Sequence, residues 1–283
     1  MPRFFIDKDI LTDESVLLTG DDAHHISRSL RMRAGEELTL CDGVGYDYHC
    51  TIEEIDDRTV RCAVHSKEKN RTEPPYRAIV FQGLAKGDRF DTVIQKSVEC
   101  GAYEIVPVIT KRCTVKLTAS DGAKKCARWN KIAEEAAKQC GRGIIPKVTE
   151  PISFDEAVKR LAELDLPLFC YEEGNAPIKA EVEAHPDATT IGIVIGPEGG
   201  FAPEEAAKMT AAGISATSLG RRILRTESAA PFVLACLSYA FEDKKAQFSS
   251  IYLTVNVSFR RFDVKLTKKI GFFIKNPYFP IEK

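Results

Sequence analysis

A branched apolar run that ends in a glycine-rich turn is the feature that most constrains how this chain folds. Residues 190–201 read TIGIVIGPEGGF. Such a run, bounded by glycine and proline, is typical of a strand buried on both faces of a sheet. The turn has neither the lysine and hydroxyl residue of a P-loop nor the glycine spacing of a dinucleotide fold, and Glu198 would repel a pyrophosphate. The turn therefore favours a ligand without a phosphate there, or it is simply a tight turn between a strand and the helix that starts at Ala202-Pro203.

Strand-like and helix-like segments alternate from residue 78 onward. The expected strands are 78–85, 103–110, 167–174, 190–200 and 215–220, and the expected helices are 88–101, 123–141, 153–164, 202–213 and 227–242. Gly101 and Gly141 are expected to end their helices, and Ser153 is expected to cap one. This alternation predicts an α/β fold with a mostly parallel sheet covered on both faces.

The first seventy residues are β-rich instead. Strands are expected at 3–6, 36–43, 46–55 and 59–69. Between the first two lies a short helix that Asp21 or Asp22 would cap. This pattern predicts a small barrel-like module whose helix exposes His24, His25, Arg28, Arg31 and Arg33.

Two prolines in the polar stretch 70–77, NRTEPPYR, mark an expected domain boundary, with domains at 1–72 and 73–245. The segment 246–283 differs from the rest. Residues 248–283 carry 7 Lys/Arg against 2 Asp/Glu and show no clear period. This tail would add a strand, bind RNA, or be an accidental end, and its sequence does not choose among these.

Composition excludes several classes of protein. No apolar run reaches the length of a membrane span, and the start lacks the apolar core of a signal peptide, so a cytoplasmic location is expected. The nine cysteines are odd in number and irregularly spaced, which favours reduced thiols. The five histidines show no metal-binding spacing, so no metal site is expected.

Charge is segregated along the chain. Residues 1–72 carry 10 Lys/Arg and 15 Asp/Glu, whereas residues 111–147 carry 10 Lys/Arg and 3 Asp/Glu. The basic segment is either a nucleic-acid-binding face or the solvated surface of a helix.

A second notable stretch is SLGRRILRTESAA, residues 218–230. Arg221, Arg222 and Arg225 share one loop, and Thr226 or Ser228 would cap the following helix. Glu227 would then lie near a helix N-terminus, where its charge is favourable. The alternative is an exposed basic loop beside an ordinary cap.

The two stretches, in this order, resemble the C-terminal half of the SPOUT methyltransferases, most closely the RsmE family, which methylates N3 of a uridine in bacterial 16S ribosomal RNA. The resemblance covers about residues 1–245. RFFI and HHISRSLRMRAGEELTLCDG are similar to its N-terminal PUA-like RNA-binding domain, and QKSVECGAYEIVPVIT, KRC and RWNKIAEEAAKQCGRGIIPKV to its central segments. TESA stands where TETA is common, and the tail has no counterpart.

The resemblance implies a SPOUT domain with a trefoil knot, formed by the segments around 170–175, 192–201 and 217–229, that binds S-adenosylmethionine. The implied cofactor-binding residues are Glu172, Gly196, Pro197, Glu198, Gly199, Gly200, Leu219, Gly220, Ile223, Leu224 and Ala229. Arg225 would stabilise a uracil anion, and Glu227 would accept a proton or organise the site. A structural ion pair between Arg225 and Glu227 stays equally open.

The implied partner is 16S ribosomal RNA within the small ribosomal subunit. The candidate phosphate contacts are Arg28, Arg31, Arg33, Lys124, Lys125, Arg128, Lys138 and Arg142. A homodimer is implied as well, and the apolar helix within 230–241 suits either that contact or the core.

Three other functions compete with this one. The first alternative is a SPOUT enzyme that methylates another RNA or a ribose 2′-hydroxyl. The second is a noncatalytic RNA-binding assembly factor, which would give no heat on titration with S-adenosylmethionine. A nucleotide-dependent enzyme is disfavoured because the sequence has no phosphate-binding loop.

Overall fold

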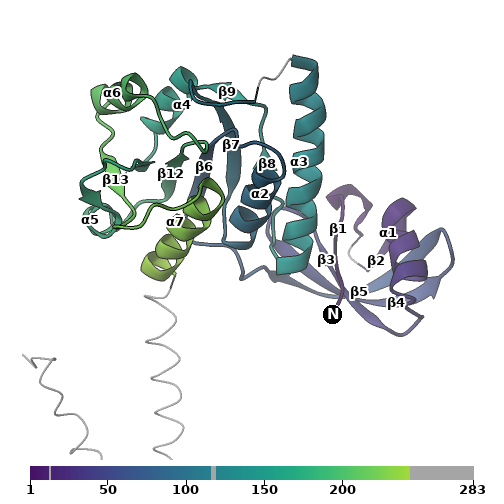
Figure 1. Cartoon of the computed structure of the whole chain (residues 1–283). Coiled ribbons are helices and arrows are strands. Elements are labelled where there is room, and N and C mark those ends of the chain that lie inside the picture. Colours follow the sequence, from purple (N-terminus) through teal and green to yellow (C-terminus); the bar gives the residue numbers. More distant parts are fainter. Residues whose placement is uncertain (13, 116–118, 243–283) are drawn as a thin grey trace, which may run out of the picture. The chain divides into compact units, whose positions relative to one another are not determined.

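A fully parallel eight-stranded sheet forms between residues 77 and 218 of the computed structural model, which describes residues 1–12, 14–115 and 119–242 (Figure 1). Its strands are β6 (Arg77–Gly83), β7 (Glu104–Ile109), β8 (Lys147–Val148), β9 (Ile152–Ser153), β10 (Leu166–Cys170), β11 (Ala176–Pro177), β12 (Thr190–Ile195) and β13 (Ala216–Ser218). The strand order is β11-β13-β10-β12-β6-β7-β8, and β9 also pairs with β7. The predicted α/β fold with a mostly parallel sheet is confirmed.

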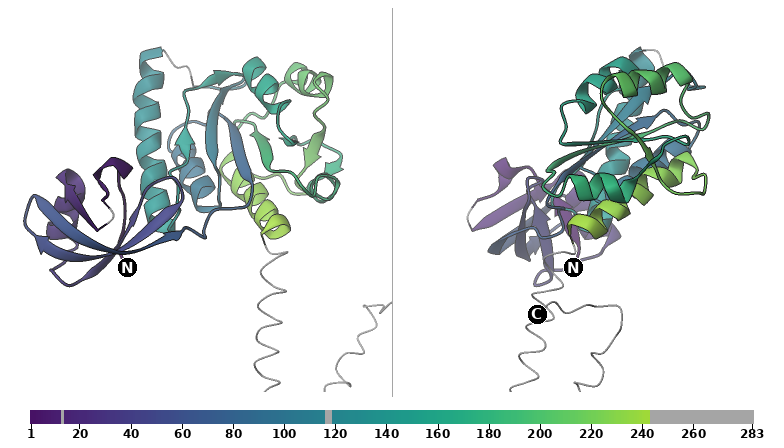
Figure 2. Two further views of the ribbon diagram at one scale, coloured as in Figure 1. Left: turned by 180° about the vertical axis from the view of Figure 1, so that it is seen from behind. Right: turned by 90° about the vertical axis from the view of Figure 1, so that its left-hand side faces the viewer.

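Helices cover both faces of this sheet (Figure 2). They are α2 (Arg89–Glu99), α3 (Ala119–Cys140), α4 (Phe154–Leu161), α5 (Ile178–Ala184), α6 (Pro203–Ala211) and α7 (Thr226–Phe241). Successive strand residues point to opposite faces. Val80 and Ile193 belong to the core beneath α2, α3 and α7, whereas Phe81 and Val194 belong to the core beneath α4 and α6. The long apolar runs of the sequence follow from this double burial.

Most of the predicted helix ends are confirmed. The Ser153 hydroxyl accepts a hydrogen bond from the Glu156 N–H at 3.2 Å and so caps α4. Gly101 and Gly141 follow α2 and α3 with φ of 91° and 77°, the left-handed conformation that glycine adopts easily. The short helix α5 was not predicted, because Val182 is its one fully buried residue and the helix therefore leaves little apolar pattern.

The N-terminal residues form a separate five-stranded, curled sheet. Its strands are β1 (Arg3–Phe5), β2 (Ser15–Thr19), β3 (Glu37–Cys41), β4 (Tyr46–Ile55) and β5 (Thr59–Lys69), in the order β1-β3-β4-β5-β2. Only the β1–β3 pair is parallel. The four predicted strands are confirmed. The prediction missed β2, because Leu17 is apolar yet 43% exposed and the expected alternation is therefore hidden.

The predicted short helix is present as α1 (Gly20–His24), followed by a π-helical turn, His25–Ser29. Asp21 and Asp22 do not cap it, which corrects the prediction. Thr19 occupies the cap position without a side-chain hydrogen bond, and the two aspartates lie in the first turn, where their charge still favours the helix. The side chains predicted to be exposed here, His24, His25, Arg28, Arg31 and Arg33, are exposed.

Glu73 and Arg142 join the segment between the two sheets to the residues that follow α3. The guanidinium of Arg142 donates to the Glu73 carboxylate at 2.6–3.1 Å and to the carbonyls of Val98 at 3.0 Å and Ala102 at 2.8 Å. The N–H of Gly143 donates to the same carboxylate at 2.8 Å. Residues Met1–Phe241 form one compact unit. The predicted boundary at 72–73 falls between β5 and β6 and remains a prediction, and the predicted tail, 246–283, lies outside the described residues.

Within residues 1–12, 14–115 and 119–242, no helix combines the length and the apolar character that crossing a membrane requires. All nine cysteines lie in this part of the chain and carry free thiols. Burial raises the pKa of Cys50 to about 11 and the pKa of Cys62 to about 12. These two thiols therefore remain protonated at neutral pH and act as small apolar core residues.

We expect Arg142→Ala to lower the free energy of unfolding by about 3–5 kcal/mol, because the largely buried carboxylate of Glu73 loses its cationic partner. Urea denaturation measures this change. The matched control is Arg128→Ala, which removes the exposed ion pair with Asp91 and should change stability by less than about 0.5 kcal/mol. Equal effects of the two substitutions would contradict a structural role for Arg142.

Candidate cofactor and substrate pocket

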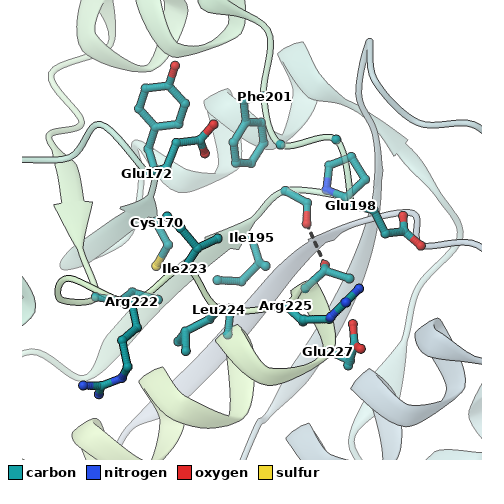
Figure 3. Close-up of a pocket in the computed structure, with 18 of the residues that line it drawn as sticks. Cys170, Glu172, Ile195, Glu198, Phe201, Arg222, Ile223, Leu224, Arg225 and Glu227 are labelled. Carbon is teal, nitrogen blue, oxygen red and sulfur yellow. Dashed lines mark hydrogen bonds between the residues drawn. The ribbon is translucent and has the colours of Figure 1, made fainter.

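A pocket of about 660 Å³ opens where three neighbouring strands of the parallel sheet end. It is built from the loops that follow β10, β12 and β13 and from the first turn of α7 (Figure 3). The carboxyl ends of parallel strands lie at one edge of a sheet, which is where open α/β sheets bind ligands. The topology therefore brings together segments that are up to about sixty residues apart in sequence.

Every residue that the sequence predicted to contact a cofactor lines this pocket. They are Glu172, Gly196, Pro197, Glu198, Gly199, Gly200, Leu219, Gly220, Ile223, Leu224 and Ala229. The two predicted catalytic residues, Arg225 and Glu227, line it as well. The described part of the chain contains no group of three or more His, Cys, Asp or Glu side chains placed to hold a metal ion.

The glycine turn at 196–200 is packed so closely that side chains would disrupt it. A Cβ atom on Gly196 would lie 3.1 Å from the Cα of Gly200 and 3.1 Å from the ring of Phe201. Gly200 has a φ of +66°, and a Cβ there would lie 3.3 Å from the carboxylate of Glu172. The turn thus exposes bare backbone to the pocket, and a ligand can approach that backbone directly.

A buried hydrogen-bonded cluster fixes the turn to the start of α7. The Thr226 hydroxyl donates to the Gly196 carbonyl at 2.7 Å and accepts from the Gln82 side-chain amide at 2.8 Å. The same amide lies 3.3 Å from the Gly196 carbonyl and 3.1 Å from the Gly83 carbonyl. Thr226 is the first residue of α7, so its hydroxyl anchors the helix to the turn and does not cap the helix as predicted.

Arg225 and Glu227 lie at one end of the pocket, and Arg222 lies at the other (Figure 3). The Arg225 side chain is exposed. No ion pair joins Arg225 to Glu227 in the described residues, so the structure does not contain the alternative arrangement considered from the sequence. Glu227 Oε2 is buried and accepts no hydrogen bond from any described residue. Because Glu227 also lines the pocket, its carboxylate is a candidate acceptor for a ligand.

The carboxylate of Glu198 is already engaged by protein donors. Its Oε1 accepts from the Lys86 backbone N–H at 3.0 Å and from Arg89 Nη1 at 2.7 Å. Burial alone would raise the pKa of Glu198, but hydrogen bonds from backbone N–H groups and from Arg89 outweigh burial and lower the pKa. Glu198 is therefore a carboxylate anion at neutral pH.

The loop after β7 supports the other side of the turn. Arg112 Nη1 donates to the Gly199 carbonyl at 2.9 Å. The buried carboxylate of Glu205 accepts from the N–H of Lys111 at 2.8 Å and from the N–H of Ala202 at 2.9 Å, which joins this loop to the start of α6. Sequence reasoning did not identify Gln82, Lys86, Arg89 or Arg112 as site residues. The one signal was Gln82 itself, a polar residue in an otherwise apolar strand.

The predicted RNA contacts divide into exposed and buried residues. Arg28, Arg31, Arg33, Lys124 and Arg128 are exposed, although Arg28 pairs with Asp57 and Arg128 pairs with Asp91. Lys125 and Lys138 are half-buried, and Lys138 pairs with Glu134 and Asp22. Arg142 contradicts its prediction. It is 3% exposed and its donors are used by Glu73 and by backbone carbonyls, so it is not placed to reach a phosphate.

We expect Thr226→Val, which keeps the shape of the side chain, to cost about 1–3 kcal/mol of stability, because it removes the donor to the partly buried Gly196 carbonyl. Urea unfolding measures the loss. The control, Ser228→Ala, changes an exposed hydroxyl in the same helix and should shift stability by less than about 0.5 kcal/mol. A wild-type unfolding midpoint for Thr226→Val would show that the cluster does not hold the turn.

Comparison with known proteins is consistent with this architecture. A family model described as an RNA methyltransferase domain matches residues 72–238, and a second, described as an RNA methyltransferase PUA domain, matches residues 18–64. Ribosomal RNA small subunit methyltransferase E of Bacillus subtilis (strain 168) is 33% identical over 250 residues, which are 86% of this chain and 98% of the relative.

Two solved structures of similar proteins contain a bound ligand. Ribosomal RNA small subunit methyltransferase E from Neisseria gonorrhoeae, bound to S-adenosyl methionine, superposes with a TM-score of 0.76 at 32% identity over 84% of this chain and 97% of that chain. A methyltransferase from Legionella pneumophila, in complex with the cofactor SAM, gives a TM-score of 0.75 at 33% identity, with the same coverage of 84% and 97%. From the match of its two domains and from these relatives, the chain belongs to the ribosomal RNA small subunit methyltransferase E family of RNA methyltransferases.

Proposed function

We propose that the chain transfers a methyl group from S-adenosylmethionine to N3 of a uridine in the 16S ribosomal RNA of the small subunit. The observation that carries the proposal is the pocket, which gathers every predicted cofactor-binding residue beside Arg225 and Glu227. The relatives are named for methylation of small-subunit ribosomal RNA. The match extends over nearly their whole length, which supports the same substrate for this chain.

The residues of the pocket fit an adenosyl cofactor. A volume of about 660 Å³ lies within the usual range of ligand pockets, roughly 300–1,000 Å³. The turn offers the backbone of Gly196, Gly199 and Gly200 to the pocket, and it carries no lysine or hydroxyl side chain suited to a phosphate. We propose that the eleven predicted residues hold the cofactor, with Glu198 contributing through its backbone because its carboxylate is engaged elsewhere.

S-adenosylmethionine supplies a methyl group that its sulfonium already activates. The protein must therefore orient the acceptor and remove its proton. We assign proton acceptance from uracil N3 to the Glu227 carboxylate, which lines the pocket and has one oxygen, Oε2, without a partner in the described residues. The exposed guanidinium of Arg225, at the same end of the pocket, would stabilise the negative charge that develops on the uracil ring.

RNA would reach this site through phosphate contacts made by exposed cations. In the N-terminal domain, proposed as residues 1–72, Arg28, Arg31 and Arg33 form a local basic patch on an otherwise acidic module. Lys124 and Arg128 of α3 are the candidates in the methyltransferase domain, proposed as residues 73–245. The target base must be unstacked and turned outward before it can enter the pocket.

Three finer features belong to the same proposal. The segments around 170–175, 192–201 and 217–229, which all line the pocket, would thread as a trefoil knot. Two chains would pair near the knot, a contact for which Ile223 (82% exposed) and Tyr239 of α7 (77% exposed) are suitable apolar residues. The protein would act in the cytoplasm, where ribosomal subunits are assembled.

Mass spectrometry of nucleosides tests the function. Small ribosomal subunits are incubated with the protein and isotope-labelled S-adenosylmethionine, and their RNA is digested. Label in 3-methyluridine supports the proposal. Label found only in a ribose-methylated nucleoside would assign the chain to 2′-hydroxyl chemistry, and no label together with no heat of cofactor binding would indicate a noncatalytic RNA-binding protein.

We expect Arg225→Ala to lower kcat by about 10²- to 10³-fold, the usual loss for one anion-stabilising donor, while the Kd for S-adenosylmethionine changes little. Single-turnover methylation and calorimetry measure the two quantities. Arg221→Ala is the matched control, because Arg221 is exposed in the same loop but does not line the pocket. Loss of folding in Arg225→Ala would instead indicate that the guanidinium is structural.

A further inference from the structure

The carboxylate of Glu198 connects two loops that are more than a hundred residues apart in the chain. We infer that Glu198 is a positioning residue, which holds the β6–α2 loop, residues 84–88, in place at the substrate end of the pocket. Two donors of that loop region meet one oxygen of Glu198: the Lys86 backbone N–H at 3.0 Å and Arg89 Nη1 at 2.7 Å. The identity of the substrate end rests on the proposed function.

Close backbone packing leaves the loop and the glycine turn little freedom to shift. A Cβ on Gly83 would lie 2.5 Å from both the nitrogen and the Cδ of Pro197, so β6 ends in direct contact with the turn. Beyond that contact the loop bends away, with Gly87 in the left-handed region at φ +65°. Glu198 links the two segments again at this second place, and the pair of contacts defines how the loop is oriented.

Glu198 lies on the same side of the pocket as Arg225 and Glu227, and Arg222 lies on the opposite side (Figure 3). Lys86 is exposed beside it, and Arg89 is held by the Glu198 carboxylate. Lys86 and Arg89 do not line the pocket themselves, but Glu198, which does, holds the Lys86 backbone and the Arg89 guanidinium beside it. If RNA enters at this end, cations held there would contact its phosphates.

A carboxylate at this rim would itself repel the RNA backbone. If Glu198 contributed charge alone, its presence would weaken binding of the proposed substrate. Its hydrogen bonds give it a different role, since they fix the backbone at Lys86 and the direction of the Arg89 guanidinium. An effect on geometry should lower the rate of methyl transfer without weakening RNA binding.

The first test measures the contact between Glu198 and the β6–α2 loop directly and needs no RNA. In the full chain, Glu198→Ala should raise the amide hydrogen-exchange rate of Lys86 about tenfold, because that N–H loses its acceptor. Glu198→Gln keeps an oxygen acceptor and should exchange close to the wild-type rate. Glu204→Ala is the matched control, since it removes a different ion pair, the one that joins the start of α6 to Lys111 in the loop after β7. An unchanged Lys86 rate in Glu198→Ala would overturn the inference.

The second test separates positioning from cofactor binding. With small ribosomal subunits and S-adenosylmethionine, Glu198→Ala should lower kcat about 10- to 100-fold, with KM for the subunits unchanged or lower and cofactor Kd within about twofold of wild type. Glu198→Gln should retain most of kcat. The double variant Arg89→Ala with Glu198→Ala should be no slower than the slower single variant, because both act through one contact.

Two outcomes would contradict the inference. A tenfold weaker cofactor Kd with unchanged kcat would make Glu198 a cofactor ligand, and additive losses in the double variant would mean that Arg89 and Glu198 act independently. Failure of the wild-type protein to label small subunits would overturn the proposed function alone. In that case the amide exchange rate of Lys86 and the cofactor Kd would still decide whether Glu198 holds the β6–α2 loop in place.

Discussion

The hydroxyl of Thr226 is the contact on which the pocket depends. It lies between the Gly196 carbonyl and the side-chain amide of Gln82, so a single buried oxygen joins the glycine turn, the start of α7 and the end of β6. Buried polar groups without partners cost free energy, so the Thr226 hydroxyl, the Gly196 carbonyl and the NH₂ group of Gln82 favour the arrangement in which they pair with one another. Because α7 carries Glu227 one residue later, the same contact also sets where the proposed proton acceptor stands. The cofactor region and the reacting end are thus positioned by one cluster.

The glycine turn is also held by contacts with the segments that follow β6 and β7. Arg112, in the loop after β7, donates a hydrogen bond to the Gly199 carbonyl. Glu198 of the turn accepts hydrogen bonds from the Lys86 N–H in the loop after β6 and from Arg89 at the start of α2. A turn made of glycine and proline has little side chain of its own to pack, so neighbouring segments must restrict its motion. Fixing the turn in advance lowers the conformational entropy that the protein loses when a ligand binds, and it keeps the backbone groups of the turn in place. This arrangement explains why the support comes from charged side chains on adjacent loops.

Sequence reasoning predicted what local patterns report. Apolar runs and glycine ends identified the strands and most helices, and the family resemblance that two motifs carry implied eleven cofactor-binding residues, all of which line the pocket. It failed where the answer depended on contacts between distant segments. Gln82 and Arg112 support a turn that lies about ninety or more residues later, and no periodicity records that proximity. Arg142 was counted with the basic surface because charge along a chain does not reveal burial, yet it is paired inside. Thr226 was predicted to cap a helix because its actual hydrogen-bond partner, the Gly196 carbonyl, is thirty residues away in the sequence.

The pairing of Arg142 with Glu73 has an evolutionary consequence. Glu73 stands in the short connection between the curled sheet and the parallel sheet, and its acid group is shared by a guanidinium and by backbone amides after α3. A gene fragment encoding only the later part of the chain, without that connection, would leave Arg142 without its carboxylate partner and with only the carbonyls of Val98 and Ala102 as acceptors. Recombination that exchanged one module for another would have to preserve this acid at the seam. A chain in which either module is exchanged therefore keeps this contact only if it keeps both the acid at position 73 and the arginine at position 142.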